Sequence, residues 1–277
     1  MVILGIETSC DETSSAILKN GTILSNTVCS QLEHVKYGGV VPEIASKNHE
    51  KLILHIVKKS LNDANVNVNE IDAIAVTYGP GLVGSLLVGL NFSKGLSIGL
   101  NVPLIGINHL EGHLVSNYIN KKNIIFPYIC LLVSGGHTQI VLVENDKYKI
   151  LAETVDDAAG EAFDKGAIIL GLKYPGGPEI EQQAFNGKLN KYNFPIPHVK
   201  SNPCNYSFSG LKTSLLYKIQ SLDEKTVKSD LCHIAASYQE AIIDTLLSKL
   251  KIVLKDNIVD TISVVGGVSI NKRFRYK

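Results

Sequence analysis

Hydrophobic positions near the N-terminus fall in short apolar runs separated by polar turns. Val2 to Ile6 is an apolar run, followed by the polar stretch Glu7 to Thr13 and a second apolar run near Ala16 to Leu18. The turn Lys19-Asn-Gly21 then leads into a third run from Thr22. Short apolar runs joined by a loop and an Asn-Gly turn predict a strand, a loop and a β-hairpin.

The same pattern recurs in the second half of the chain. Its parts are the apolar run Tyr128 to Val133, the glycine loop Ser134 to Thr138, the run Gln139 to Val143, the turn Glu144 to Asp146 and the run Tyr148 to Ala152. A repeat of this size predicts two homologous lobes.

The repeat continues into a glycine turn in each half. Ile71 to Thr77 is an apolar run that leads into Gly79-Pro-Gly81, and Val259 to Val265 leads into Gly266 to Ser269. A strand, a glycine turn and a helix start form the layout in which backbone N–H groups face an anion.

The two halves differ in the segment after the glycine turn. The first half continues with a predicted helix from about Leu82 through Leu100 and a predicted strand from Pro103 to Ile107. The second half has only Asn271 to Lys277. The repeat therefore predicts that the second lobe is incomplete and lacks a closing helix and strand.

Helical spacing of apolar residues predicts two longer helices, Val41 to Leu61 and Asp230 to Leu254. Three prolines and two asparagines between positions 195 and 205 predict an irregular loop. There is no low-complexity linker. We therefore expect an α/β fold of two closely joined lobes, 1–115 and 116–277.

Composition narrows the class of protein. With 45% hydrophobic residues, the chain of 277 residues can bury a sizeable core. The five cysteines are scattered and odd in number, which predicts no disulfide framework. No signal pattern and no apolar run of membrane-spanning length is evident, so we expect a cytoplasmic protein with no membrane partner. The net charge of +1 gives no support for a nucleic-acid partner.

His109 and His113 are candidate metal ligands because two histidines four residues apart lie on the same face of a helix. By itself, such a pair is more often a packed or surface pair than a metal site. Glu111 lies about 200° round the helix from His109. The metalloprotease arrangement, in which the glutamate directly follows the first histidine, is therefore not present.

Three further segments carry candidate chemistry. The Ser134 to Thr138 loop suits a phosphate but equally a glycine-rich hairpin turn. Asp11 and Glu12 could hold a metal, orient a substrate or be solvated loop carboxylates. Asp164, with the glycine turn Tyr174 to Glu179, could hold a ribose or amino-acid hydroxyl, whereas the acids from Asp156 onward also fit an ordinary helix start.

Taken together, these segments resemble the TsaD family of tRNA adenosine threonylcarbamoyltransferases. The resemblance is carried by ordered motifs from the first residue to about Arg273: Gly5 to Thr13, Tyr37 to Glu43, Gly79 to Gly84, His109 to His113, Leu132 to Thr138, Asp156 to Lys165, Pro175 to Pro178, Ser207 to Lys212 and Gly266 to Asn271. It implies two homologous actin-like and Hsp70-like ATPase lobes, with mixed sheets flanked by helices.

The resemblance also implies an activity. The family transfers the threonylcarbamoyl group of threonylcarbamoyl-adenylate to the exocyclic amine of the adenosine next to the anticodon, in tRNAs that read codons beginning with A. The nucleophile belongs to the tRNA, so the enzyme needs no serine or cysteine triad.

By motif position, the resemblance implies roles for individual residues. His109 and His113 would be two of three ligands to one iron ion (Fe²⁺) per subunit, with zinc or another divalent metal as alternatives. Asp11 and Glu12 would support the chemistry at the cleft. The adenylate contacts would be Leu132, Val133, Ser134, Gly135, Gly136, Asp164, Gly177, Glu181 and Asn271.

The family's third metal ligand is an aspartate that lies a few dozen residues beyond the Asn271 turn. We therefore expect a chain truncated at the C-terminus, with that ligand absent. The implied partners are tRNA, threonylcarbamoyl-adenylate, a paralogous actin-like subunit and a small P-loop ATPase. The basic residues Lys272, Arg273, Arg275 and Lys277 either contact tRNA phosphates or form a solvated face.

Three other functions remain open at this stage. The first is an inactive nucleotide-binding remnant of the transferase. The second is a metalloprotease, which the position of Glu111 disfavours because a general base must reach the metal-bound water. The third is a sugar kinase of the same fold, for which no acceptor pocket or base can be identified.

Overall fold

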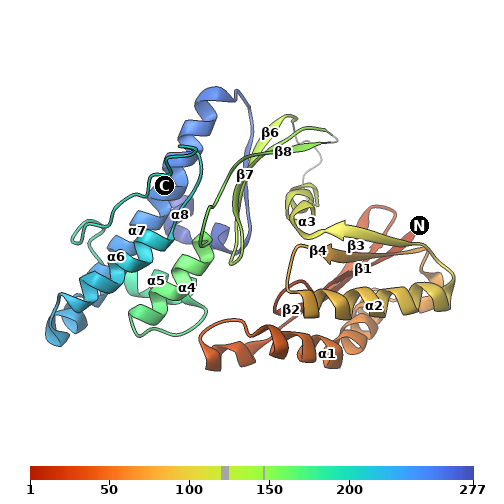
Figure 1. The fold of residues 1–277 in the computed structure, drawn as a ribbon. Helices are drawn as coiled ribbons and strands as arrows, with labels where there is room; N and C mark the ends of the chain where they lie inside the picture. Colours follow the sequence, from red (N-terminus) through yellow and green to blue (C-terminus); the bar gives the residue numbers. More distant parts are fainter. Residues whose placement is uncertain (120–124, 146) are drawn as a thin grey trace. The chain divides into compact units, whose positions relative to one another are not determined.

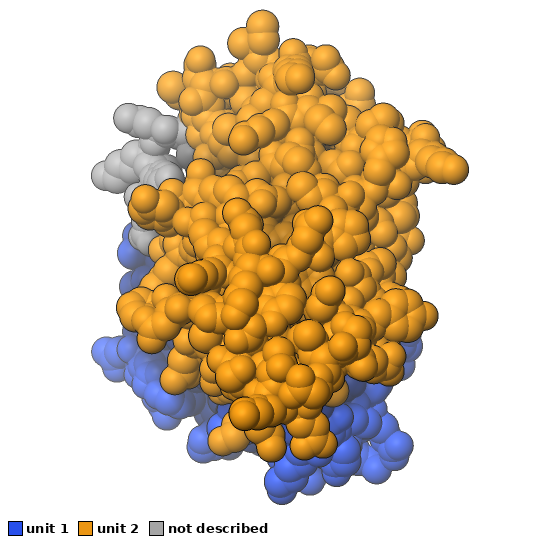
Figure 2. All heavy atoms as spheres, turned by 90° about the vertical axis from the view of Figure 1, so that its left-hand side faces the viewer, with its two compact units in different colours: residues 1–112 blue, residues 113–277 orange. Residues whose placement is uncertain are grey.

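The computed structural model describes residues 1–119, 125–145 and 147–277. The chain divides into two compact units, residues 1–112 (unit 1) and 113–277 (unit 2), coloured separately in Figure 2. Each unit is an α/β structure in which helices cover a mixed sheet (Figure 1). The predicted fold class is thereby confirmed. Asp146, the end of a predicted turn, lies outside the described residues.

Unit 1 contains a five-stranded sheet with the order β3-β2-β1-β4-β5. The strands are β1 (Val2–Glu7), β2 (Glu12–Lys19), β3 (Thr22–Ser30), β4 (Ala73–Gly79) and β5 (Leu104–Asn108). The first three strands pair antiparallel, and β1, β4 and β5 pair parallel. Asn20 and Gly21 have φ values of 50° and 81° in the β2–β3 turn. The Asn-Gly pair supplies this hairpin because both residues tolerate positive φ.

Two helices cover one face of this sheet (Figure 1). They are α1 (Pro42–Asp63) and α2 (Val83–Leu100), and η1 (Leu32–Tyr37) and η2 (Val68–Glu70) are short 3₁₀ turns. Alternate residues of β1, namely Val2, Leu4 and Ile6, are buried against Ile53 and Val57 of α1. This alternation is the period-2 pattern of a strand with one covered face.

Helix α2 corrects one sequence prediction. Its 18 residues make it long and apolar enough to span a membrane by length and composition, although no run of that kind was expected. Within unit 1 the helix packs against α1 and β4, and Ser85, Gly89 and Ser93 are its buried positions. A helix that packs on the sheet of a globular unit can meet the same criteria of length and composition as a membrane-spanning helix.

Unit 2 repeats the strand plan of unit 1. Its sheet has the order β8-β7-β6-β9, with β6 (Tyr128–Val133), β7 (Thr138–Val143), β8 (Tyr148–Glu153) and β9 (Ile262–Val265). Neighbours β6 to β8 are antiparallel, and β6 pairs parallel with β9. These strands correspond to β1, β2, β3 and β4, so the predicted repeat is confirmed. Among the described residues, unit 2 has no counterpart of β5.

Helices fill the rest of unit 2. They are α4 (Ala159–Ile169), α5 (Gly176–Ala184), α6 (Ser209–Gln220), α7 (Glu224–Asp256), η4 (Gly267–Ile270) and α8 (Lys272–Tyr276). Strand β6 is buried at all its positions, and its alternate residues Ile129, Leu131 and Val133 lie in a core shared with α4 to α7. Helix α7 begins at Glu224 rather than at Asp230, and its buried residues start only at Ile234. The boundary between the units falls within α3 (His109–Val115), which η3 (Ser116–Tyr118) follows.

Candidate functional site

The histidine pair lies on α3, directly after the edge strand β5. The side-chain carbonyl of Asn108 accepts hydrogen bonds from the backbone N–H groups of Leu110 at 2.9 Å and Glu111 at 3.4 Å. This cap starts the helix at His109 and places His113 one turn later. Both imidazoles are therefore on one helix at the predicted spacing. That they bind a metal remains a prediction.

The Glu7 carboxylate contacts the imidazole of His109. Its Oε2 lies 3.2 Å from His109 Nδ1, and Ser9 Oγ lies 3.1 Å from the same nitrogen. The Glu7 carboxylate also accepts hydrogen bonds from the Ser9 backbone N–H and the Thr77 hydroxyl. Burial raises the pKa of Glu7, but the hydrogen bonds from His109, Ser9 and Thr77 outweigh it and lower the pKa to about 2. Glu7 is therefore ionised.

The loop that follows Glu7 packs against the start of α2. The Leu82 N–H donates to the Ser9 carbonyl at 2.8 Å, and the Thr8 hydroxyl donates to the Ser85 carbonyl at 2.9 Å. A Cβ on Gly81 would lie 2.5 Å from the Ser9 carbonyl oxygen. Glycine at this position therefore permits the close approach of the two loops.

Asp11 and Glu12 lie at the far end of the same loop. Glu12 is exposed and accepts a hydrogen bond from the Ser30 hydroxyl at 2.8 Å, whereas the Asp11 backbone carbonyl accepts one from Gln31 N–H at 3.0 Å. Their predicted supporting role in catalysis remains a prediction.

His49 is a buried histidine that the sequence patterns did not single out. Its Nε2 donates to the Cys10 carbonyl at 2.9 Å, and its Nδ1 accepts from the Thr13 hydroxyl at 2.8 Å. Burial lowers its pKa, so the ring is neutral and ties helix α1 to the loop. The sequence contained one indication of this burial. His49 lies four residues after Ala45 and four before Ile53, which are also buried positions of α1.

In unit 2, the glycine loop joins three elements at the end of β6. The Gly160 N–H of α4 donates to the Ser134 carbonyl at 3.1 Å, and a Cβ on Gly160 would lie 2.6 Å from that oxygen. On the β9 side, Gly266 has φ +92°, and a Cβ there would lie 2.3 Å from the Val133 carbonyl oxygen. Of the predicted adenylate residues, Leu132 and Val133 thus end β6, and Ser134 to Gly136 form a loop held between α4 and the β9 turn.

The other predicted adenylate residues form two further contacts in unit 2. Asp164 accepts a hydrogen bond from the Gly176 N–H at 2.7 Å, and Glu181 accepts one from the Lys272 N–H at 2.8 Å. Gly177 lies in the first turn of α5, so the expected glycine turn is largely helical. Asn271 is buried, caps α8 through the Phe274 N–H at 2.9 Å and donates to Gln239 at 2.8 Å.

The acidic pair Asp156 and Asp157 holds the start of α6. Asp156 accepts from the backbone N–H groups of Phe208 at 2.7 Å and Ser209 at 3.3 Å. Asp157 accepts from Lys212 Nζ at 2.9 Å. Asp156 therefore caps α6. The sequence pattern placed Asp156 only at an ordinary helix start and did not connect it to α6.

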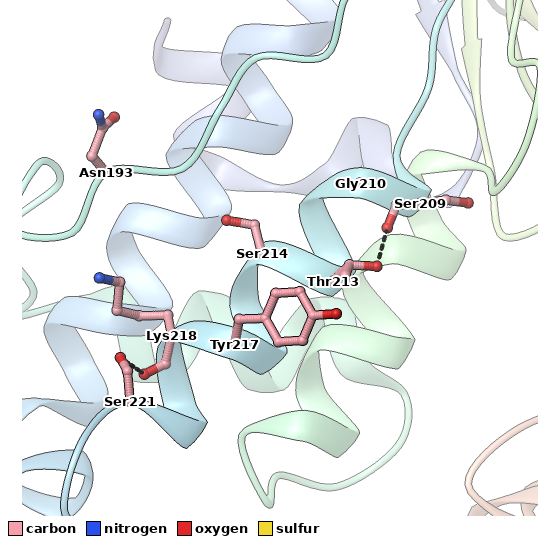
Figure 3. A pocket seen from close by; sticks show the side chains of 8 residues that line it. All are labelled: Asn193, Ser209, Gly210, Thr213, Ser214, Tyr217, Lys218 and Ser221. Carbon is pink, nitrogen blue, oxygen red and sulfur yellow. Dashed lines mark hydrogen bonds between the residues drawn. The ribbon is translucent and has the colours of Figure 1, made fainter.

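Helix α6 also borders an open groove of about 700 Å³ on unit 2, shown in Figure 3. Hydroxyl groups, an exposed tyrosine and a lysine dominate its lining, which comprises Asn193, Ser209, Gly210, Thr213, Ser214, Tyr217, Lys218 and Ser221. Thr213 donates to the Ser209 carbonyl at 3.1 Å, so its hydroxyl is partly engaged. The lining offers hydroxyl, amide and ammonium groups, although apolar atoms contribute more of its surface than polar atoms do.

The family model described as "TsaD: tRNA N6-adenosine threonylcarbamoyltransferase" matches residues 22–277. The chain belongs to this family. A TsaD relative from Thermosipho africanus is 54% identical over 100% of this chain and 84% of its own length. The relative from Clostridioides difficile is 47% identical over 100% of this chain and 83% of its own length. Both carry the name tRNA N6-adenosine threonylcarbamoyltransferase.

Solved structures confirm the actin-like and Hsp70-like ATPase fold of this TsaD family member. Component A of the Acidaminococcus fermentans (R)-2-hydroxyglutaryl-CoA dehydratase is 15% identical, with a TM-score of 0.58 over 100% of this chain and 86% of that chain. The ROK hexokinase of Thermus thermophilus is 13% identical, with a TM-score of 0.51 over 100% of this chain and 86% of that chain. At these identities the likeness concerns the fold alone.

Proposed function

We propose that this protein transfers the threonylcarbamoyl group from threonylcarbamoyl-adenylate to the exocyclic amine of an adenosine in tRNA. Membership of the TsaD family carries this proposal. The acceptor is the adenosine adjacent to the anticodon in tRNAs that read codons beginning with A. A bond forms between the amine nitrogen and the carbonyl carbon, the bond from that carbon to the phosphate oxygen breaks, and AMP and a proton leave.

The geometry of unit 2 supports a nucleotide at the end of β6. The Ser134 to Gly136 loop offers backbone donors beside the start of α4, an arrangement suited to a phosphate. Gly160 and Gly266 hold that loop in place because neither position has room for a side chain. Preorganised donors of this kind stabilise the charge that develops on the departing AMP.

We further propose that His109 and His113 hold a divalent metal, with iron as the expected ion. Imidazole is a common ligand for iron, zinc and related metals, and two rings one helical turn apart fit part of such a site. Among the described residues, no group of three His, Cys, Asp or Glu side chains is placed to hold a metal. A bound metal would supply Lewis acidity toward the carbamoyl or phosphate oxygen.

Positive charge is concentrated in residues 188–230 of unit 2, which include the residues that line the α6 groove. Residues 188–230 contain seven lysines against three acidic residues, whereas the whole chain has a net charge of +1. Lys218 lines the groove and forms no ion pair with a described residue. Lys191 and Lys212 of this segment pair with Asp230 and Asp157, and Arg273 and Lys277 of the basic tail pair with Glu240. We therefore place the tRNA phosphate contacts on the 188–230 surface rather than on the tail.

Partners and location derive from the proposed reaction. We propose that a paralogous actin-like subunit and a small P-loop ATPase complete the active complex, and that the complex works in the cytoplasm, where tRNA is modified. The inactive-remnant and metalloprotease alternatives are not favoured, because the Thermosipho africanus and Clostridioides difficile relatives are both named as transferases.

The decisive experiment is in-vitro modification. The purified chain is incubated with the partner proteins, threonylcarbamoyl-adenylate and a tRNA transcript that reads an A-starting codon, and nucleosides are analysed by mass spectrometry. We expect threonylcarbamoyladenosine with this protein and with the Thermosipho africanus relative as positive control. Product from the relative but none from this chain would refute the proposal.

A further inference from the structure

Helix α6 presents an aromatic ring and a lysine side by side on the surface of unit 2. Leu211 and Leu215 of this helix are buried in the core, which leaves Tyr217, 65% exposed, on the outer side. Lys218 follows it in the same turn and is half-buried. Both side chains line the open groove (Figure 3).

The described residues of unit 2 provide no partner for the ends of these two side chains. The ring of Tyr217 stacks on no other described ring, and its hydroxyl forms no hydrogen bond with a described residue. Lys218 forms no ion pair there, whereas Lys191 and Lys212 of the same segment each pair with an aspartate. An exposed ring beside an unpaired cation is the combination that holds an unpaired nucleotide, by stacking on its base and contacting its phosphate.

The size and openness of the groove favour one residue of a polymer. Its volume of about 700 Å³ is in the range of small-molecule sites and far exceeds that of a single ion. A free small molecule is usually enclosed over most of its surface, but this groove is open. A polymer can place one residue in it and continue on either side. Asn193 and Ser214 add hydrogen-bonding groups to the lining.

We propose that the α6 groove binds one unpaired nucleotide of RNA, whose base stacks on Tyr217 and whose phosphate contacts Lys218. This inference rests on the proposed tRNA substrate, and it adds a base contact to the phosphate contacts of the 188–230 surface. RNA carries one negative charge for every base, so it satisfies the ring and the lysine together. An acidic peptide would satisfy Lys218 alone.

The first test measures tRNA affinity with the full-length protein. Tyr217→Leu should weaken binding about 5- to 150-fold, the loss expected for one base–aromatic stack, whereas Tyr217→Phe should bind as the wild type does. The slope of log affinity against log salt should stay unchanged in both variants, because stacking neutralises no phosphate. Tyr276→Leu is the matched control, since Tyr276 is 85% exposed on α8 and does not line the groove.

The second test uses fluorescence, because the chain contains no tryptophan. Tyr217→Trp introduces a single fluorophore at the proposed stacking position, and Tyr276→Trp places one outside the groove. We expect tRNA and an unstructured RNA oligonucleotide to quench the fluorescence of Tyr217→Trp. The same oligonucleotide in a duplex should not quench it, because paired bases are already stacked. The fluorescence of Tyr276→Trp should be unaffected by the oligonucleotide.

The outcomes separate this inference from the proposed function. Equal tRNA affinity of the wild type and folded Tyr217→Leu would overturn the inference. So would a fluorescence change of Tyr217→Trp with the partner proteins but not with RNA, which would make the groove a protein-docking surface. In either case, threonylcarbamoyladenosine formed by the wild type would leave the proposed function intact. RNA-dependent quenching without product would support the inference and refute the proposed reaction, and a wild-type protein that binds no RNA would overturn both.

Discussion

Gly266 should be the least replaceable glycine in the turn after β9. Its backbone has φ +92° and ψ 167°, a region that is essentially restricted to glycine. An added Cβ would also lie 2.3 Å from the carbonyl oxygen and 2.7 Å from the carbonyl carbon of Val133. Gly266→Ala therefore combines backbone strain with a steric clash.

The backbone strain and the clash together determine how much Gly266→Ala should destabilise the protein. Occupying a glycine-only region costs about 1–3 kcal/mol, and overpacking a tight contact typically costs about 1–3 kcal/mol. The free energy of unfolding should therefore fall by about 3 kcal/mol or more, which corresponds to a loss of roughly 6–12 °C in Tm for a unit of this size. Relief of the clash would displace Val133 and the Ser134 loop, so binding of an adenylate analogue should weaken as well.

The neighbouring glycine provides the control. Gly267 lies in η4, and a Cβ there would meet nothing within 4 Å. Gly267→Ala should change stability by less than about 1 kcal/mol, because helical alanine is no worse than glycine. Both variants are compared by thermal and urea unfolding followed by circular dichroism. Equal stability of the two variants would refute the argument from backbone geometry and close packing.

Three further variants probe contacts in unit 2. Asp156→Ala removes the cap of α6 and should lower the free energy of unfolding by about 1 kcal/mol in urea titrations. Hydrogen bonds from Arg273 and Lys277 lower the pKa of buried Glu240 below 4.5, so its stabilisation is present above that pH and is lost as pH falls through the lowered pKa. Glu240→Gln should cost about 3 kcal/mol at pH 7, because Arg273 keeps an unpaired charge, and should flatten the acid limb of the stability–pH curve. Lys218→Glu should weaken tRNA binding and reduce the slope of log affinity against log salt by about one, whereas Lys59→Glu in unit 1 should not.

The sequence predicted elements best where a local pattern determines them. The strand at Tyr128–Val133 agrees at both ends, because a run of buried residues is bounded by a glycine loop. The start of α7 was placed too late because residues before Ile234 are not buried, so apolar spacing does not mark them. Their helix is set by the Asp223 cap, which accepts the Thr226 N–H at 2.9 Å.

The candidate site was predictable only in part. The histidine spacing on α3 and the glycine loop are contiguous motifs, and both appear where the sequence placed them. Glu7 and Thr77 lie 70 positions apart and meet only because β1 pairs with β4. No spacing rule can associate residues whose proximity arises from sheet order.

Helix α7 has a consequence for local opening of unit 2. Its 33 residues span about 50 Å, yet residues 224–233 have no fully buried side chain, whereas Ile234 to Val253 contribute fifteen buried positions. The first segment is held by its backbone hydrogen bonds, its cap and the polar contacts of Asp230 and His233 with the 188–192 segment, and the second by the core. Backbone amides of the first segment should therefore exchange with deuterium through fraying, while those of the second exchange only when unit 2 unfolds.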